Sequence, residues 1–271
     1  MAKSTRGGKA GATTTFTLRQ PAFHPVTNPR PTPQPTPQPA PQPVVQPAIQ
    51  PVVSADYDAF KKMTDDQKAD AITQAAKTQV PVFLAQNDLQ KVLYGLKLND
   101  KPVLVDDNVL DTMPGRDLYR TVNATNDQTY RIKYSATDVA SQVIRGSVTR
   151  VSDTGGSVHG RGIYFADSYH GSTTYGRTSG NINQTAVVRV KLSPAAKTIS
   201  THAAATGVSA EIASGSKLGK ALSRIGSTDR TAVWSLAKGY DAMVATNGYH
   251  VVVNRSALVA SKTIKAMGQS W

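Results

Sequence analysis

A glycine-flanked aromatic strand is the part of this chain whose residues are best suited to hold a ligand. Gly160 and Gly162 precede the run Ile163-Tyr164-Phe165-Ala166-Asp167, and Ser172 and Tyr175 follow it. Glycine allows a backbone to approach a ligand closely. Two tyrosines with a serine between them could enclose a flat ring, because aromatic faces stack and a hydroxyl fixes the orientation. A half-buried strand followed by a polar loop explains the same residues without a ligand.

The overall composition excludes several kinds of site and favours an anionic partner. The chain of 271 residues has no cysteine, which excludes disulfides and thiolate zinc sites, and its five histidines lack metal-ligand spacing, so no metal site is expected. There is no apolar run long enough for a membrane-spanning helix and no secretory signal. The formal charge of +13 suits nucleic acid, a nucleotide or an acidic surface, although solubility alone explains it equally well.

Two low-complexity segments come before the part of the chain that is expected to fold. Residues 1–30 contain five lysine or arginine residues and no acidic one, which predicts a disordered arm that nucleic acid or a capsid interior would order. Residues 31–53 are uncharged and rich in alternating proline, which predicts a polyproline II spacer of up to roughly 70 Å. A solubilising tail and a proline-motif ligand are the alternatives for these two segments.

Residues 54–117 are predicted to form a helical segment that packs on the core. Thr64 and Gln67 have the spacing of a capping box, which indicates the start of a helix of about a dozen residues. A second helix is expected over residues 87–96, where apolar residues recur on one side. Residues 102–105 are then expected to be a short extended piece. This segment completes the hydrophobic core, with partner binding as the alternative.

From Leu118 onward the pattern is typical of β-strands, apart from one helical stretch. Strands are expected over residues 118–122, 130–134, 163–165, 185–192, 240–244 and 249–254. A tight Asn247-Gly248 turn joins the last two, and residues 257–264 are expected to form an edge strand. Residues 205–238 are expected to be helical or loop-like, and residues 139–144 fit either a strand or a helix. Together these patterns predict an α+β fold with an antiparallel-rich sheet.

The glycine-flanked strand resembles, position for position, the NAD-binding signature of the ADP-ribosyltransferase superfamily, in the form found in its poly-ADP-ribose polymerase-like branch. The residues that match are Gly160, Gly162, Ile163, Tyr164, Phe165, Ala166, Asp167, Ser172 and Tyr175. Upstream, Leu118-Tyr119-Arg120-Thr121 looks like the family's first core strand, and residues 249–254 resemble its late strand. The three matches occur in family order and cover residues 118–265, so residues 118–271 are the predicted ADP-ribosyltransferase-like domain.

The resemblance implies a split antiparallel sheet with a cleft in which NAD binds as the substrate. Tyr164 and Tyr175 would enclose the nicotinamide ring, while Ser172 and the backbone of Thr121 would hold its carboxamide. Arg120 would contact a ribose or a phosphate, a task that suits a planar and permanently charged guanidinium. The NAD-binding residues implied in this way are Arg120, Thr121, Gly160, Gly162, Tyr164, Phe165, Ser172 and Tyr175.

The chain departs from the family pattern at the catalytic carboxylate. Loss of nicotinamide develops positive charge on the ribose, and a nearby carboxylate should stabilise that charge. The family usually places a glutamate at the start of the late strand, where this chain has Tyr249. Glu211 is the only glutamate in the chain and is the candidate replacement, with Asp241 as a second stand-in. The expected catalytic residues are therefore Arg120 and Ser172, with Glu211 or Tyr249.

The expected function is transfer of ADP-ribose from NAD to a macromolecular acceptor, in the first place a protein. A basic arm on a proline tether attached to such a domain looks like the transferases of tailed bacteriophages. This likeness implies a phage-encoded protein that is virion-associated or lies in the host cytoplasm, without membrane contact. The alternative is a catalytically impaired virion or nucleic-acid-associated binding protein that keeps the fold and has lost the acid.

Overall fold

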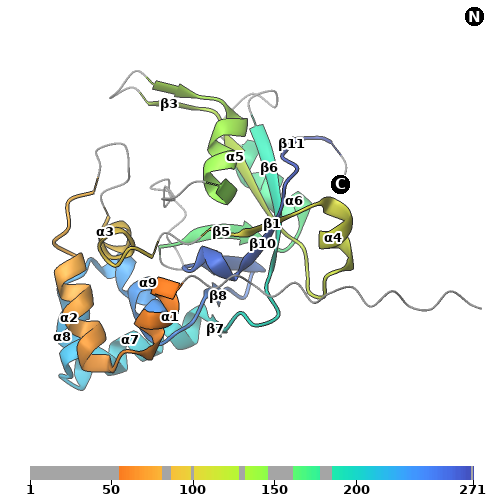
Figure 1. Cartoon of the computed structure of the whole chain (residues 1–271). Helices are drawn as coiled ribbons and strands as arrows, with labels where there is room; N and C mark the ends of the chain where they lie inside the picture. Colours follow the sequence, from red (N-terminus) through yellow and green to blue (C-terminus); the bar gives the residue numbers. More distant parts are fainter. Residues whose placement is uncertain are drawn as a thin grey trace, which may run out of the picture. The chain divides into compact units, whose positions relative to one another are not determined.

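A nine-stranded, mostly antiparallel sheet organises the fold in the computed structural model (Figure 1). The structure describes residues 55–80, 87–98, 101–127, 132–145, 161–177, 185–269 and 271, and all of them fall within one compact unit. Within these residues the strand order is β1-β10-β6-β2-β5-β9-β8-β7, and β11 also pairs with β6. Only the β1–β10 and β7–β8 pairs are parallel. The predicted α+β class with an antiparallel-rich sheet is therefore confirmed.

The strands of the sheet agree closely with the apolar and alternating runs of the sequence. They are β1 (Val103–Val105), β2 (Leu118–Asn123), β5 (Ile163–Ala166), β6 (Thr185–Leu192), β7 (Thr198–Ser200), β8 (Ala242–Val244), β9 (Tyr249–Val252), β10 (Leu258–Ser261) and β11 (Lys265–Ala266). A separate hairpin joins β3 (Thr125–Asp127) to β4 (Ile132–Tyr134). The predicted turn between β8 and β9 is confirmed, and Gly248 adopts there the positive φ of 84° that glycine accommodates without strain.

Several of the helices begin at capping side chains. They are α1 (Ala55–Lys62), α2 (Asp65–Ala75), α3 (Asp88–Gly95), α4 (Asp107–Thr112), α5 (Ala136–Arg145), α6 (Tyr169–Arg177), α7 (Thr201–Ala213), α8 (Lys217–Ser223) and α9 (Ser227–Ala237). The predicted capping box is confirmed, because the Thr64 hydroxyl accepts from the Gln67 amide and the Gln67 side chain accepts from the Thr64 amide. Asn87 caps α3 by accepting from the Gln90 amide at 2.8 Å.

Two hydrophobic cores cover opposite faces of the sheet. The first core packs α1, α2 and α3 together with α7, α8 and α9, and reaches the sheet through Met243 and Val251. The second core packs α5 against β2, β5 and β6, and includes Ala242 and Val252. Because neighbouring residues of a strand point to opposite faces, these adjacent pairs on β8 and β9 place the cores on the two sides. The N-terminal helices and the C-terminal helices thus share one core.

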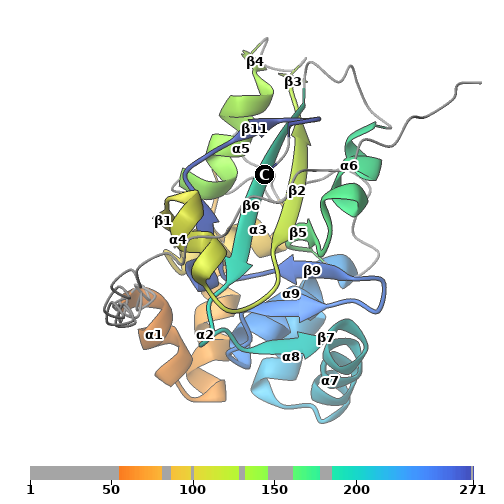
Figure 2. The same ribbon diagram turned by 90° about the vertical axis from the view of Figure 1, so that its right-hand side faces the viewer.

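The sheet consists of two halves that are joined at a single residue pair. Strand β2 pairs with β6 at six positions, but it pairs with β5 only at Tyr119 and Ala166. Strand β5 in turn pairs with β9 at four positions. Figure 2 shows the consequence: β2 and β6 run steeply through the view, whereas β9 and β7 run nearly across it. The ladder between β2 and β5 therefore opens beyond Tyr119.

One expectation from the sequence is wrong, because packing overrides the local pattern. The segment predicted as an edge strand contains β10, which lies inside the sheet between β1 and β6. Its residues are buried because a short strand from far upstream, β1, covers the edge. The polar segment after residue 167 is the helix α6 rather than a loop. Residues 139–144, which fitted two alternatives, lie in the helix α5.

Several expectations fall outside the part of the chain that the structure describes. The basic arm, residues 1–30, and the proline-rich spacer, residues 31–53, are among them. The division into residues 54–117 and 118–271 stays a prediction. Among the described residues, no helix combines the length and the apolar character needed to cross a membrane.

We predict that replacing Asp241 destabilises the fold strongly. This carboxylate is 2% exposed and accepts from the Lys197 amide at 2.8 Å, from Asn254 Nδ2 at 2.7 Å and from Lys61 Nζ at 3.2 Å. Asp241→Ala leaves these donors without an acceptor and should cost about 3 kcal/mol in urea unfolding. Lys61→Met removes only a half-exposed charge and should cost less than about 1 kcal/mol. Equal stability of Asp241→Ala and wild type would contradict this account.

Candidate functional site

The opening of the β2–β5 ladder holds the guanidinium of Arg120. Arg120 follows Tyr119, the last residue of β2 that pairs with β5. Its Nη1 atom donates to the backbone carbonyl of Tyr164 at 3.0 Å. The arginine side chain thus spans the gap where a backbone amide would otherwise continue the ladder. The Arg120 guanidinium therefore bridges β2 and β5 at the position where the backbone pairing between them ends.

Arg120 is a cation that no carboxylate in the described part of the chain neutralises. The side chain as a whole is half-buried, and its Nε atom is buried without a hydrogen-bond partner among the described residues. Burial lowers the pKa of the Arg120 guanidinium to about 10, and no carboxylate in the described residues contributes to that shift. The group is still protonated at neutral pH. A half-buried cation with an unused donor is suited to bind an anion or a ligand hydroxyl.

One face of the sheet beside Arg120 carries most of the other predicted residues. In the observed register Tyr119 lies opposite Ala166, Tyr164 lies opposite Val251, and Ala166 lies opposite Tyr249. Since side chains alternate along each strand, Tyr119, Tyr164 and Tyr249 share a face, and so does Thr121. Helix α6 lies on this face, because it contacts both β2 and β5 (Figure 2).

Helix α6 brings Ser172 to Thr121. The two hydroxyl oxygens are 3.1 Å apart, and Ser172 Oγ also donates to the Tyr169 carbonyl at 2.9 Å. Since the single Ser172 proton is used in that bond, Thr121 is the donor between the two hydroxyls. Ser172 Oγ therefore keeps one lone pair that can accept an N–H from a ligand. The resemblance implied that Ser172 and Thr121 hold the same carboxamide of the ligand. The 3.1 Å between their hydroxyl oxygens is consistent with that arrangement.

Tyr249, at the position where a glutamate was expected, contacts the same helix. Its hydroxyl donates to the Gly171 carbonyl, at the long distance of 3.5 Å. Gly171 precedes Ser172 and lies close to Ala166: a Cβ added at Gly171 would be 3.5 Å from Ala166 Cβ. Tyr249 is half-buried and carries a phenol in place of a carboxylate. It can orient α6 and form a wall, but it cannot supply a negative charge.

Two of the predicted NAD-binding residues have other surroundings, and two more lie wholly or partly outside the described residues. Phe165 is fully buried in the second core, on the face opposite to Tyr164. Gly162 lies tightly against β9, because a Cβ at this position would come within 2.5 Å of Val251 Cγ1. Gly160 lies outside the described residues. Tyr175 lies in α6, one turn after Ser172, but its side chain also falls outside the described part.

Glu211 is held in a different part of the fold. It lies on α7, where Ser216 Oγ donates to its Oε1 at 2.6 Å and Lys238 Nζ lies 3.0 Å from its Oε2. Burial raises the pKa of Glu211, but the hydrogen bonds from Ser216 and Lys238 and the charge of Lys238 outweigh burial and leave the pKa lowered. Its contacts among the described residues thus tie α7 to α8 and α9. They do not bring it to Arg120.

Sequence reasoning missed the residues that fix the start of α6. Ser168 Oγ accepts from the Gly171 amide at 3.1 Å, which caps this helix. The Tyr169 ring packs edge-on against Tyr119 with ring centres 5.9 Å apart, and its hydroxyl accepts from the Gly268 amide at 2.7 Å. A serine three residues before the glycine was the available signal for the cap. The contacts to Tyr119 and Gly268 have no local signal, because they are long-range.

Glu211→Gln should reveal a structural rather than a catalytic role for this carboxylate. Its pKa is lower in the folded protein than the ordinary value of 4.5, so its stabilising effect is present above that pH and disappears as the pH falls through the folded-state pKa. We expect the variant to lose about 1–3 kcal/mol of unfolding free energy at pH 7. The difference from wild type should shrink in urea unfolding as the pH falls below 4.5. A difference that stays unchanged as the pH falls through the acidic range would contradict the ionic account.

Comparisons with known proteins identify no relative of this chain, so the candidate site is chosen from the geometry of its own residues. No family model matches the sequence, no curated protein matches it, and no solved structure matches the fold. Among the described residues, no group of histidine, aspartate and glutamate side chains could hold a metal ion. The site that remains is the junction of the two half-sheets, with Arg120, Thr121, Tyr164, Ser172 and Tyr249.

Proposed function

We propose that the chain binds NAD at the junction of β2 and β5 and transfers ADP-ribose from it to a macromolecular acceptor. The observation that carries this proposal is the half-buried Arg120, whose charge is unpaired by any described carboxylate and whose Nε atom has no hydrogen-bond partner. NAD offers both groups that such an arginine binds, a pyrophosphate and ribose hydroxyls. The resemblance of residues 118–265 to ADP-ribosyltransferases supports the same ligand.

The face shared by Thr121, Tyr164 and Tyr249 is suited to the nicotinamide end. Tyr164 offers a half-buried ring against which a planar ring can stack. The remaining lone pair of Ser172 Oγ accepts one N–H of a carboxamide, and the Thr121 hydroxyl lies 3.1 Å from it. Arg120 is the next residue of β2, so its side chain leaves the strand on the opposite face. Its guanidinium reaches the Tyr164 carbonyl in the opening between β2 and β5 and would meet the ribose or phosphate side there. In this arrangement the glycosidic bond lies between the hydroxyl pair and the guanidinium.

The reaction requires that the bond between the nicotinamide nitrogen and the ribose breaks. Nicotinamide leaves as a neutral molecule with the bonding electrons, and the ribose carbon develops positive charge. An acceptor nucleophile then forms the new bond and gives its proton to solvent. With Glu211 held elsewhere and a tyrosine at position 249, the described residues supply no carboxylate at this site to stabilise that charge. We therefore expect turnover to be slow.

The same observation favours a second candidate, an NAD-binding protein without turnover. In that case Arg120, Thr121 and Ser172 bind the dinucleotide, and the missing carboxylate stops the reaction before the glycosidic bond breaks. Release of nicotinamide from NAD by the full chain separates the two candidates. Release that Arg120→Gln abolishes supports the transferase, while NAD binding without release supports the binding protein.

We predict that Arg120→Gln weakens NAD binding by roughly 10- to 100-fold. The substitution removes a charge-assisted contact worth about 1.5–3 kcal/mol. Isothermal titration calorimetry of the full chain measures the dissociation constant. Arg224→Gln, which removes an exposed arginine after α8, should bind NAD like wild type. Absence of NAD binding by wild type, or equal affinity of both variants, would refute the proposed site.

A further inference from the structure

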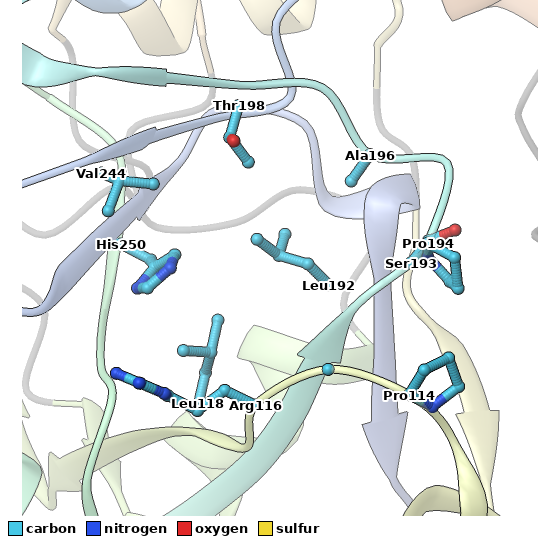
Figure 3. Close-up of a pocket in the computed structure, with 11 residues that line it drawn as sticks. Pro114, Arg116, Leu118, Leu192, Ser193, Pro194, Ala196, Thr198, Val244 and His250 are labelled. Carbon is cyan, nitrogen blue, oxygen red and sulfur yellow. The ribbon is translucent and has the colours of Figure 1, made fainter.

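A pocket of about 330 Å³ lies at the other side of the junction between the half-sheets (Figure 3). It is lined by side chains from the start of β2, the end of β6 and the strands β7, β8 and β9. His250 contributes to it and is the residue after Tyr249, so the two side chains point to opposite faces of β9. The pocket is therefore separate from the face that carries Thr121, Tyr164 and Ser172.

The walls of the pocket are mostly apolar. Arg116 and His250 are on one side, and Ser193 and Thr198 lie apart from them (Figure 3). Leu118, Leu192 and Val244 line it from the sheet, and Pro114 and Pro194 lie together on the side away from His250 (Figure 3). Arg116 extends toward the His250 side in the same view. A cavity of this size with few polar groups matches the general character of small-molecule sites.

The polar side of the pocket carries no net charge. Arg116 Nη1 donates to Asp167 Oδ2 at 2.8 Å, which pairs the two charges. Burial lowers the pKa of His250 below its ordinary value of 6.5, although the Gly248 backbone and Asp167 act in the opposite direction. The imidazole is thus neutral at pH 7. A charged ligand would lose water here without gaining an unpaired opposite charge.

His250 offers an unused hydrogen-bonding atom in this neutral setting. Its Nδ1 atom is buried and has no hydrogen-bond partner among the described residues. An unmet polar atom that is buried costs free energy, and a ligand with a matching group recovers it. We propose that this pocket is a second ligand site, which takes an uncharged, ring-sized aromatic or branched aliphatic molecule with one hydrogen-bonding group directed at His250. This site goes beyond the proposed NAD site and does not depend on it.

Methyl NMR of the full chain, titrated with four probes of one size, tests this proposal. Benzyl alcohol should shift the Leu192 and Val244 methyl signals and saturate, with a dissociation constant on the order of millimolar. Toluene lacks the hydrogen-bonding group, and benzoate and benzylammonium carry a charge. Each of these three should bind about tenfold more weakly. Toluene or either charged probe binding as tightly as benzyl alcohol would overturn the ligand class.

A matched pair of tryptophan substitutions locates the binding. Ala196 lines the pocket and is half-exposed, so Ala196→Trp should fill it and abolish the benzyl alcohol shifts. Ala195 is exposed and does not line the pocket, so Ala195→Trp should bind like wild type. Unchanged binding by Ala196→Trp would overturn the site, and so would the absence of saturable shifts in wild type. If Ala196→Trp does not fold, the comparison of the four probes on wild type still decides.

Discussion

The hydrogen bond from Arg120 to the Tyr164 carbonyl is the interaction on which the centre of this structure depends. Backbone pairing between β2 and β5 stops after one residue pair, and the guanidinium takes up the carbonyl that the open ladder would leave unmet. The same arginine keeps a buried Nε atom without a partner. The Arg120 side chain thus joins the two half-sheets, and its Nε–H remains a hydrogen-bond donor for a ligand at their junction.

The rest of the fold presents different chemistry on the two sides of that junction. On one side α6 supplies Ser172 to Thr121, and the tyrosines of β5 and β9 form a face against which a flat ring can pack. On the other side the pocket beside His250 is apolar and carries no net charge. Glu211 belongs to neither side, because Lys238 and Ser216 use its carboxylate to hold three helices together. Stabilisation of the positive charge that develops on the ribose is therefore the function for which the proposed site is least well equipped.

Local sequence patterns predicted most of the helices and strands, but the order in which the strands pair is seen only in the structure. The capping box at Thr64, the strand that contains Arg120 and the Asn247-Gly248 turn are encoded in neighbouring residues. The position of β10 inside the sheet depends on β1, more than 150 residues earlier, and no local pattern reports it. The closeness of Ser172 to Thr121 followed from a family resemblance. The ion pair of Glu211 with Lys238, which helps to decide its role, joins two helices and is not revealed by local spacing.

The most direct test of the account observes the Arg120 Nε–H group itself. In ¹⁵N-labelled full chain, the Nε–H signal that is missing from the Arg120→Gln spectrum belongs to Arg120. The account predicts that NAD shifts this signal in a saturable way and protects its proton from exchange with water, because the unused donor gains an acceptor. If the Arg120 signal stays unchanged at NAD concentrations that saturate the chain, the central claim is contradicted.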